Sequence, residues 1–245
     1  MSRLAVLFAC SIATAFYLRL TRSPEPTTAE PMPIKVFTAA ELKEGSASGL
    51  LLLAVLGSVF DVTKGARHYA HGGSYHFFTG RDGSRAFATG DFTEAGLRDD
   101  VDGLEPAAVA EIERYRLFYI DEYTRVGVLQ GRYYNGDGTP TAELDKVQEL
   151  LKLATSAKTA EEDEKRRYPQ CSTQWAQGQG GSIWCETKND QRGQQLLVPR
   201  KYHSQVTKQK RCACVPIDEA AVAAAGRFEL YADCEPTSSR CKTPP

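Results

Sequence analysis

The sequence predicts an α+β protein in three parts: an α+β domain over residues 34–133, a turn and helical connector over 134–167, and a small module over 168–245. Two observations predict this organisation. In the first part, short apolar runs bounded by turn residues are mixed with helix-like segments, which is typical of α+β domains. Six of the seven cysteines gather in the last part, and these are Cys171, Cys185, Cys212, Cys214, Cys234 and Cys241.

The amino-terminal 33 residues differ from the rest of the chain. Arg3 precedes an apolar run from Leu4 to Leu18. This run has the length of the hydrophobic region of a signal peptide and is shorter than the ~20 residues that cross a bilayer. We therefore expect a signal peptide over residues 1–22, with a short retained anchor as the alternative, and a proline-rich linker over 23–33.

Local patterns predict the first elements of the 34–133 domain. Thr38 is a typical helix N-cap, and we expect a short helix from there to Gly45. Leu50–Val55 and Gly57–Val62 are apolar runs around a tight turn, which indicates two short buried strands.

The second half of this domain follows a Gly-, His- and Tyr-rich stretch. Several short helices are expected up to Arg116. A β-like pattern covers Leu117–Ile120 and resumes over Tyr123–Leu129, and both runs are expected to be strands. A cluster of turn residues at 135–138 then marks the end of the domain.

The connector is expected to form a helix that starts at Thr139-Pro140, since proline is favoured in the first turn. One face of this helix is apolar, because residues of that kind recur at helical spacing. They are Leu144, Val147, Leu151 and Ala154. A charged run over 161–167 closes the helix and is expected to be solvated.

The six cysteines of the 168–245 module predict disulfide bonds. An even set in a short, turn-rich region is typical of proteins that fold in an oxidising compartment. A zinc site is the alternative, supported only by the close spacing of Cys212 and Cys214, since no Cys-x2-Cys pair is present. The pairing stays open, because six cysteines can be connected in many ways.

Two further features of this module carry expectations. Trp175 and Trp184 are expected to lie in its core, because so small a unit has few other large apolar side chains to bury. The stretch from Arg200 to Arg211 is rich in Lys and Arg. We expect it to be a solvated surface, with binding of an acidic glycan or partner as the alternative.

Composition and charge exclude some classes of function. The chain is 42% hydrophobic and 25% charged, as is usual for a globular protein. Its net charge of −1 creates no overall field that would attract nucleic acid or an anionic membrane, so no nucleic-acid partner is expected. No Ser-His-Asp, Cys-His or paired-carboxylate pattern stands out, and the sequence therefore does not predict an enzyme.

The stretch with the most chemical interest runs from Asp61 to Arg85. It contains Asp61-Val62-Thr63-Lys64, two tyrosines six residues apart in a Gly-rich loop (Tyr69 and Tyr75), and Gly80-Arg81-Asp82-Gly83-Ser84-Arg85. A Tyr-x-x-Val-Gly motif follows at 123–127. Together these motifs resemble the membrane-associated progesterone receptor branch of the cytochrome b5-like family. The resemblance implies a cytochrome b5-like fold for the 34–133 domain and haem b as its cofactor.

Histidines do not offer two opposite ligands for such a haem. His68, His71 and His76 belong to one short loop, and the next histidine, His203, lies beyond the domain. Two axial ligands must approach the porphyrin from its two faces, which residues of one short loop cannot do. Bis-histidine ligation is therefore not expected, and ligation by a single histidine stays as an alternative.

Tyrosine has precedent as a haem ligand. The resemblance implies that Tyr75 is the axial ligand of the iron, that Tyr69 hydrogen-bonds near it, and that Tyr123 contacts the haem periphery. A bound cation lowers the pKa of its ligand, and the hard phenolate favours Fe(III). Because no second axial ligand is evident, we expect a five-coordinate ferric haem. Glu122 stands where the family has lysine, so the contact of that lysine with a haem propionate is lost. Arg125 is the candidate to replace this contact.

Other polar residues of the stretch receive ordinary roles. Asp82 and Ser84 are expected to cap the helix that follows them. Arg81 and Arg85 are expected either at the haem edge or in surface ion pairs.

We therefore expect a non-enzymatic haem-binding protein, secreted or lumenal, that signals through an unidentified partner or receptor. The resemblance implies a role in promoting neuronal differentiation. The alternatives are an electron carrier for a haem enzyme and a binding module for a steroid or other small apolar ligand. Membrane contact, at endomembranes, is expected only if the amino-terminal segment is retained, and haem could also mediate a homodimer.

Overall fold

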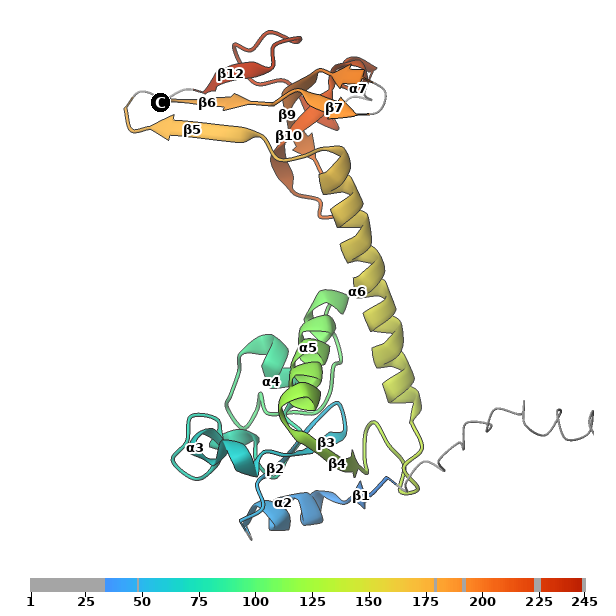
Figure 1. Ribbon diagram of the computed structural model, residues 1–245. Helices are drawn as coiled ribbons and strands as arrows, with labels where there is room; N and C mark the ends of the chain where they lie inside the picture. The colour runs from blue at the N-terminus through green and yellow to red at the C-terminus, as the bar shows by residue number, and fades with distance from the viewer. Residues whose placement is uncertain (1–33, 48, 179, 191–192, 223–225, 244–245) are drawn as a thin grey trace, which may run out of the picture.

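The computed structural model describes residues 34–47, 49–178, 180–190, 193–222 and 226–243. The expected signal peptide (1–22) and linker (23–33) lie outside these residues. Figure 1 shows two folded parts, one at each end of a long helix. The amino-terminal part contains, in chain order, β1 (Val36–Phe37), α2 (Ala39–Ala47), β2 (Leu52–Val55), β3 (Ser58–Asp61), η1 (Thr63–Gly65), α3 (Ala66–Tyr69), η2 (His76–Phe78), α4 (Ser84–Thr89), α5 (Pro106–Glu122) and β4 (Thr124–Leu129).

Four strands form one sheet in the order β1-β4-β3-β2, with β1 parallel to β4 and the other neighbours antiparallel. Alternate residues of a strand face opposite sides. Leu53 of β2 accordingly packs with Ile112 of α5 in one core cluster, whereas Leu52 packs with Leu42 of α2 in another. Both faces of β2 are covered, which explains its uninterrupted apolar run. The mixture of helices and strands confirms the predicted α+β class.

The start of α2 has the predicted N-cap. The amide of Glu41 donates to Thr38 Oγ1 (3.2 Å), and the amide of Thr38 donates to the Glu41 carboxylate (2.8 Å). This reciprocal pair is a capping box, which satisfies two amides that the helix itself leaves without partners. The prediction of a helix start at Thr38 is confirmed.

The turn between β2 and β3 is held by residues that were expected to cap α4. Leu56 and Gly57 both have positive φ (47° and 72°), as a two-residue hairpin turn requires. The amide of Leu56 donates to Ser84 Oγ (2.7 Å), and the amide of Gly57 donates to Asp82 Oδ2 (2.8 Å). Gly83 occupies the N-cap position of α4, and Asp82 Oδ1 accepts the amide of Ser84, the first residue of this helix (3.0 Å). The capping prediction is therefore confirmed for Asp82 and wrong for Ser84, whose hydroxyl holds the hairpin instead.

Helix α5 contradicts the expected strand over Leu117–Ile120, because one unbroken helix runs through this segment. Its buried residues Val109, Ile112 and Tyr119 lie at helical spacing and face the core. No glycine or proline interrupts the helix after Pro106, so the apolar run continues it instead of starting a strand.

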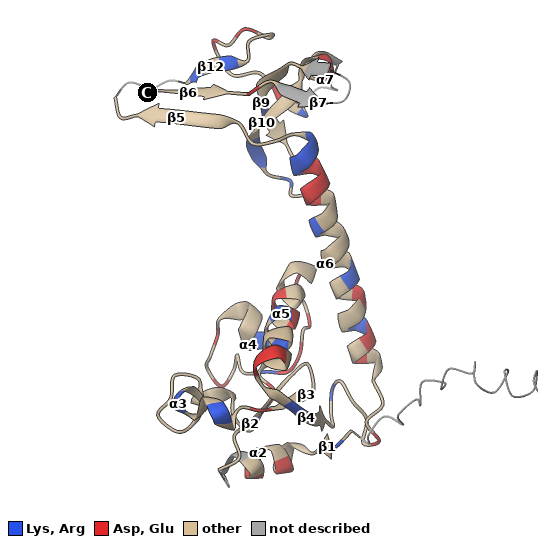
Figure 2. Cartoon of the chain, in the orientation of Figure 1, with Lys and Arg blue, Asp and Glu red and all other residues tan. Residues whose placement is uncertain are grey.

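The connector is the helix α6 (Ala142–Arg167), which begins two residues after Pro140. Its first turns belong to the core of the amino-terminal part, since Val147 is buried in the same cluster as Tyr133. Further along, acidic and basic residues alternate on the helix (Figure 2). Some of them form ion pairs, as Lys152 does with Glu149 (2.7 Å). Neither α6 nor any other helix within the described ranges is long and apolar enough to cross a membrane.

The carboxyl-terminal module contains β5 (Ser172–Ala176), β6 (Gly180–Trp184), β7 (Lys188–Asp190), β8 (Gly193–Gln195), β9 (Leu197–His203), β10 (Lys210–Pro216), α7 (Ile217–Val222), β11 (Phe228–Glu229) and β12 (Arg240–Thr243). Three small sheets result, in the orders β10-β9-β11, β12-β6-β5 and β7-β8. Glu164, in the last turns of α6, accepts hydrogen bonds from Tyr202, Ser204 and Gln205. These bonds fix the module to the end of the helix.

All six cysteines of the module are paired, which confirms the predicted disulfides. The bonds are Cys171–Cys212, Cys185–Cys214 and Cys234–Cys241. The alternative of a zinc site built from these cysteines is wrong, because every sulfur is already bonded to another.

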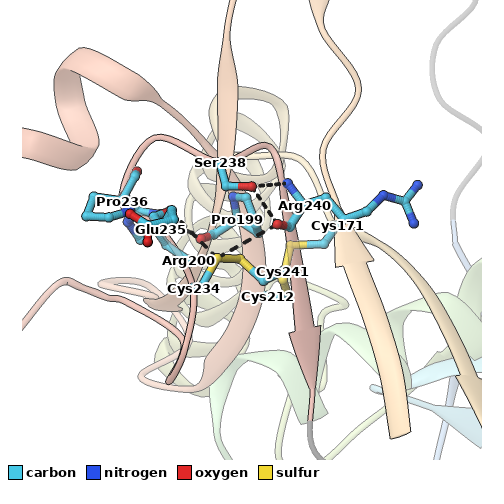
Figure 3. The surroundings of a disulfide bond; sticks show 10 residues. All are labelled: Cys171, Pro199, Arg200, Cys212, Cys234, Glu235, Pro236, Ser238, Arg240 and Cys241. Carbon is cyan, nitrogen blue, oxygen red and sulfur yellow. Dashed lines mark hydrogen bonds between the residues drawn. A yellow bond between two sulfur atoms is a disulfide. The ribbon is translucent and has the colours of Figure 1, made fainter. Parts of the chain in front are cut away.

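The expectation for Trp175 is wrong, and that for the basic stretch is wrong in part. Trp175 is 63% exposed, because the edge strand β5 pairs it with Gly181, which has no side chain to cover it. Arg200 is buried instead of solvated, and it donates to the carbonyl of Pro236 (2.6 Å) beside Cys234 (Figure 3).

Candidate functional site

A cavity of about 1080 Å³ opens between η1, α3, η2, α4 and α5 of the amino-terminal part. Small-molecule and cofactor sites have volumes of roughly 300–1,000 Å³, so this cavity has room for a large ligand. Its walls are mostly aromatic or small. The lining residues are Lys64, Gly65, Arg67, His68, Tyr69, Tyr75, Phe78, Ala86, Phe87, Ala88, Thr89, Gly90, Phe92, Tyr115, Phe118, Tyr119, Glu122 and Tyr123.

The Gly-rich loop between α3 and η2 positions Tyr75 in this cavity. The amide of Tyr75 donates to the carbonyl of His68 (2.8 Å), so the loop folds back onto α3. Gly72 has φ of +87°, a conformation that glycine adopts without strain. At Gly73, a Cβ would collide with the backbone carbonyl of His68. The two glycines therefore allow the tight return that brings Tyr75 to the cavity.

Tyr69 is buried at the end of α3, and its hydroxyl lies 2.9 Å from that of Tyr119 in α5. Burial raises the pKa of Tyr69 to about 12. Burial, and then the hydrogen bond with Tyr69, also raises the pKa of Tyr119. Both side chains consequently stay protonated phenols at neutral pH, each satisfied by the other.

Tyr123 packs edge-on against Tyr69, with ring centroids 5.9 Å apart. Its hydroxyl lies over Gly65, where a Cβ would come within 2.7 Å of that oxygen. The glycine of the Thr63-Lys64-Gly65 motif is thus needed for Tyr123 to approach η1.

Tyr75 has a different environment from Tyr69 and Tyr119. It is 46% exposed, and no residue in the described ranges forms a hydrogen bond with its hydroxyl. Its ring lies 6.1 Å from the rings of both Tyr69 and His68. The three tyrosines chosen from the sequence, Tyr69, Tyr75 and Tyr123, therefore line one cavity, although only Tyr75 combines exposure with a hydroxyl that the protein leaves unbonded.

The sequence reasoning missed the wall that α5 contributes. Tyr115, Phe118, Tyr119 and Glu122 recur at intervals of three and four residues, which places them on one helical face. The helical spacing of these residues is visible in the sequence, but it was not recognised because a strand was expected over Leu117–Ile120.

The polar groups around the cavity are few. Lys64 Nζ lies 3.9 Å from Glu122 Oε2 and 5.0 Å from the ring centroid of Tyr123. Arg67 Nε donates to His68 Nε2 (2.8 Å). Arg125 does not line the cavity, so it does not replace the family lysine there.

The remaining polar residues of the motif lie elsewhere. Arg81 and Arg85 form the ion pairs Arg81–Glu94 (2.7 Å) and Arg85–Asp100 (2.8 Å), and neither lines the cavity. Their ion-pair alternative is therefore confirmed. Of the four histidines, His68 is the one that contributes to the cavity wall.

Comparisons with known proteins place these features in context. Residues 38–133 match the family model for the cytochrome b5-like heme/steroid binding domain. Neuferricin of Danio rerio is 39% identical over 199 residues, which is 81% of this chain and 74% of that protein. Membrane-associated progesterone-binding protein 4 of Arabidopsis thaliana is 39% identical over 213 residues, 85% of this chain and 84% of that protein. Neuferricin of Mus musculus is 39% identical over 186 residues, which is 74% of this chain and 71% of that protein.

Proposed function

This chain belongs to the neuferricin family and has a cytochrome b5-like domain, and from this premise we propose that it binds haem b through the phenolate of Tyr75. The observation that carries the proposal is the contrast among the tyrosines of the cavity. Tyr69 and Tyr119 bond each other and are held protonated, whereas Tyr75 is half-exposed with no hydrogen-bond partner within the described residues. The Tyr75 oxygen can therefore coordinate an iron without breaking a hydrogen bond to the protein.

The cavity suits haem in shape and chemistry. A porphyrin is flat and largely apolar, and aromatic side chains such as Phe87 and Phe118 line the walls. The volume of about 1080 Å³ supports a ligand of this size. Haem would supply an iron centre, while the protein supplies the ligand oxygen, the apolar walls and the exclusion of water.

The ligand set supports a single axial ligand from the protein. A free phenol titrates near pH 10, but a bound cation stabilises the phenolate. The hard, anionic oxygen of Tyr75 favours ferric over ferrous iron. His68 lies on the same α3–η2 segment as Tyr75, so it cannot approach the opposite face of the same porphyrin.

The biological role that we propose is binding and signalling, not catalysis or rapid electron transfer. The three disulfides are typical of proteins that fold in an oxidising compartment, which supports a secreted or lumenal location. The family resemblance supports a role in promoting neuronal differentiation through a protein partner.

The test is the absorbance spectrum of the purified, haem-loaded chain and of two variants. Tyr75→Phe removes the proposed ligand oxygen, and Tyr115→Phe removes a hydroxyl from the same cavity as a matched control. We expect a high-spin ferric spectrum in the wild type and in Tyr115→Phe, and its loss in Tyr75→Phe.

Two outcomes contradict the proposal. A low-spin spectrum of bis-imidazole type excludes tyrosine ligation. A folded protein that takes up no haem but binds a steroid or another apolar ligand indicates that the cavity serves that ligand instead.

A further inference from the structure

Two of the charged side chains that line the cavity, Lys64 and Glu122, lie side by side. Lys64 and Arg67 come from η1 and α3, and Glu122 ends α5. Aromatic rings line much of the remaining wall, and among them Phe78 of η2 and Phe87 of α4 stack with centroids 4.5 Å apart. The lining therefore combines aromatic walls with an ion pair, which matches a ligand that is apolar over most of its area and carboxylated at one edge.

Lys64 and Glu122 form an ion pair that a ligand can replace. Their charged atoms are 3.9 Å apart, and the side chains are 63% and 57% exposed. An ion pair of this kind contributes little to stability, because water solvates both groups well. The Lys64 ammonium also lies 5.0 Å from the centroid of the Tyr123 ring, so it is held at the cavity wall between an aromatic face and a carboxylate.

We propose that Lys64 binds a haem propionate and that Glu122 competes with the propionate for this ammonium. The inference rests on the proposed function and concerns the strength of haem binding at the same cavity. A propionate is a carboxylate like that of Glu122, so haem binding exchanges one carboxylate on Lys64 for another. Glu122 then remains nearby as a like charge, which opposes binding. Glu122 thus makes haem easier to release, while Lys64 retains it.

The experiment measures haem affinity by absorbance titration and haem release by transfer to an excess of a tight haem-binding protein. The variants are Glu122→Gln, Glu122→Lys and Lys64→Gln. Glu44→Gln and Lys43→Gln on α2 make the same charge changes as Glu122→Gln and Lys64→Gln, but away from the cavity, and serve as their matched controls. The thermal midpoint of each haem-free variant checks that it folds.

We expect Glu122→Gln to tighten haem binding about two- to fivefold, the size of an ionic contact between exposed groups, and Glu122→Lys to tighten it further. Lys64→Gln should weaken binding by a similar factor. Because salt screens exposed charges, these differences should shrink as the ionic strength rises. The controls should leave the affinity unchanged.

A second ligand isolates the propionates. Haem dimethyl ester keeps the porphyrin and the iron but lacks both negative charges, so wild type and Glu122→Gln should bind it equally well. The inference is overturned if wild type binds haem and Glu122→Gln leaves its affinity unchanged, or if Glu122→Gln affects the ester as much as haem. A folded wild type that takes up no haem instead overturns the proposed function itself.

Discussion

The hydroxyls of Tyr69 and Tyr119 lie 2.9 Å apart and share a buried hydrogen bond that joins α3 to α5 beside the cavity. Tyr69→Phe leaves the Tyr119 hydroxyl buried without this partner. We expect the free energy of unfolding to fall by about 1–2 kcal/mol, the cost of an unsatisfied buried polar group. Urea denaturation at pH 7 measures this loss.

The double variant Tyr69→Phe/Tyr119→Phe is the control for that prediction. It removes both hydroxyls, so no donor or acceptor remains unpaired. Its loss of unfolding free energy should be smaller than the sum of the losses in Tyr69→Phe and Tyr119→Phe. Strictly additive losses would show that the two hydroxyls do not act as a pair.

Gly73→Ala should weaken haem binding. The added Cβ collides with the His68 carbonyl, which also accepts the amide of Tyr75, so the loop that carries Tyr75 must shift. Local backbone strain costs about 1–3 kcal/mol, and we expect haem affinity to fall about tenfold in an absorbance titration. Gly103→Ala strains a positive φ (+70°) in open space away from the cavity and should leave haem affinity intact. Equal losses in both variants would contradict the steric explanation.

Asp82 should make stability depend on pH. Burial raises the pKa of this carboxyl from 3.8 to about 6. Between these values the folded state holds a proton that the unfolded state releases, so stability falls as pH rises through this window. The stabilising contribution is complete below pH 3.8 and lost above pH 6, and it amounts to roughly 3 kcal/mol.

The measurement compares urea denaturation of wild type and Asp82→Asn from pH 4 to 7. Other titrating groups affect both proteins alike, so the difference between the two curves reports Asp82. This difference should change across the window from 3.8 to 6. A constant difference would mean that Asp82 does not titrate there.

Removing the Cys185–Cys214 bond should destabilise the carboxyl-terminal module more than removing Cys234–Cys241. The first closes a loop of 29 residues and the second one of 7. When both cysteines of a bond are changed to serine, loop entropy predicts that the free energy of unfolding falls by about 3–4 kcal/mol for Cys185–Cys214 and by about 2 kcal/mol for Cys234–Cys241. Both tryptophans of the chain lie in this module, so denaturation followed by tryptophan fluorescence reports the module alone. The opposite order of losses would contradict the entropic account.

Patterns confined to a few neighbouring residues could be predicted from the sequence. Thr38 and Glu41 are three residues apart and cap α2 through their own side chains, and the apolar runs around Gly57 form the expected hairpin. Such features depend on local backbone chemistry, which the sequence contains directly.

Features set by distant partners could not be predicted. The exposure of Trp175 depends on its pairing with Gly181 across a hairpin. The pairing of Cys212 with Cys171 depends on the bridge between Gln170 and Ala213, which brings Cys171 to β10. The different environments of Tyr69 and Tyr75 are of the same kind. Tyr69 is bonded by Tyr119, which lies 50 positions further along the chain.

Helix α6 sets both the distance and the relative rotation between the two folded parts. Its 26 residues span about 39 Å at 1.5 Å per residue. Its first turns pack on the amino-terminal part through Val147, and its last turns bind the module through Glu164. Each residue inserted between these two anchors would turn the module by about 100° about the helix axis. One inserted residue would thus disrupt a surface built from both parts. Four inserted residues would return the module to nearly its original direction but displace it by about 6 Å along the helix axis.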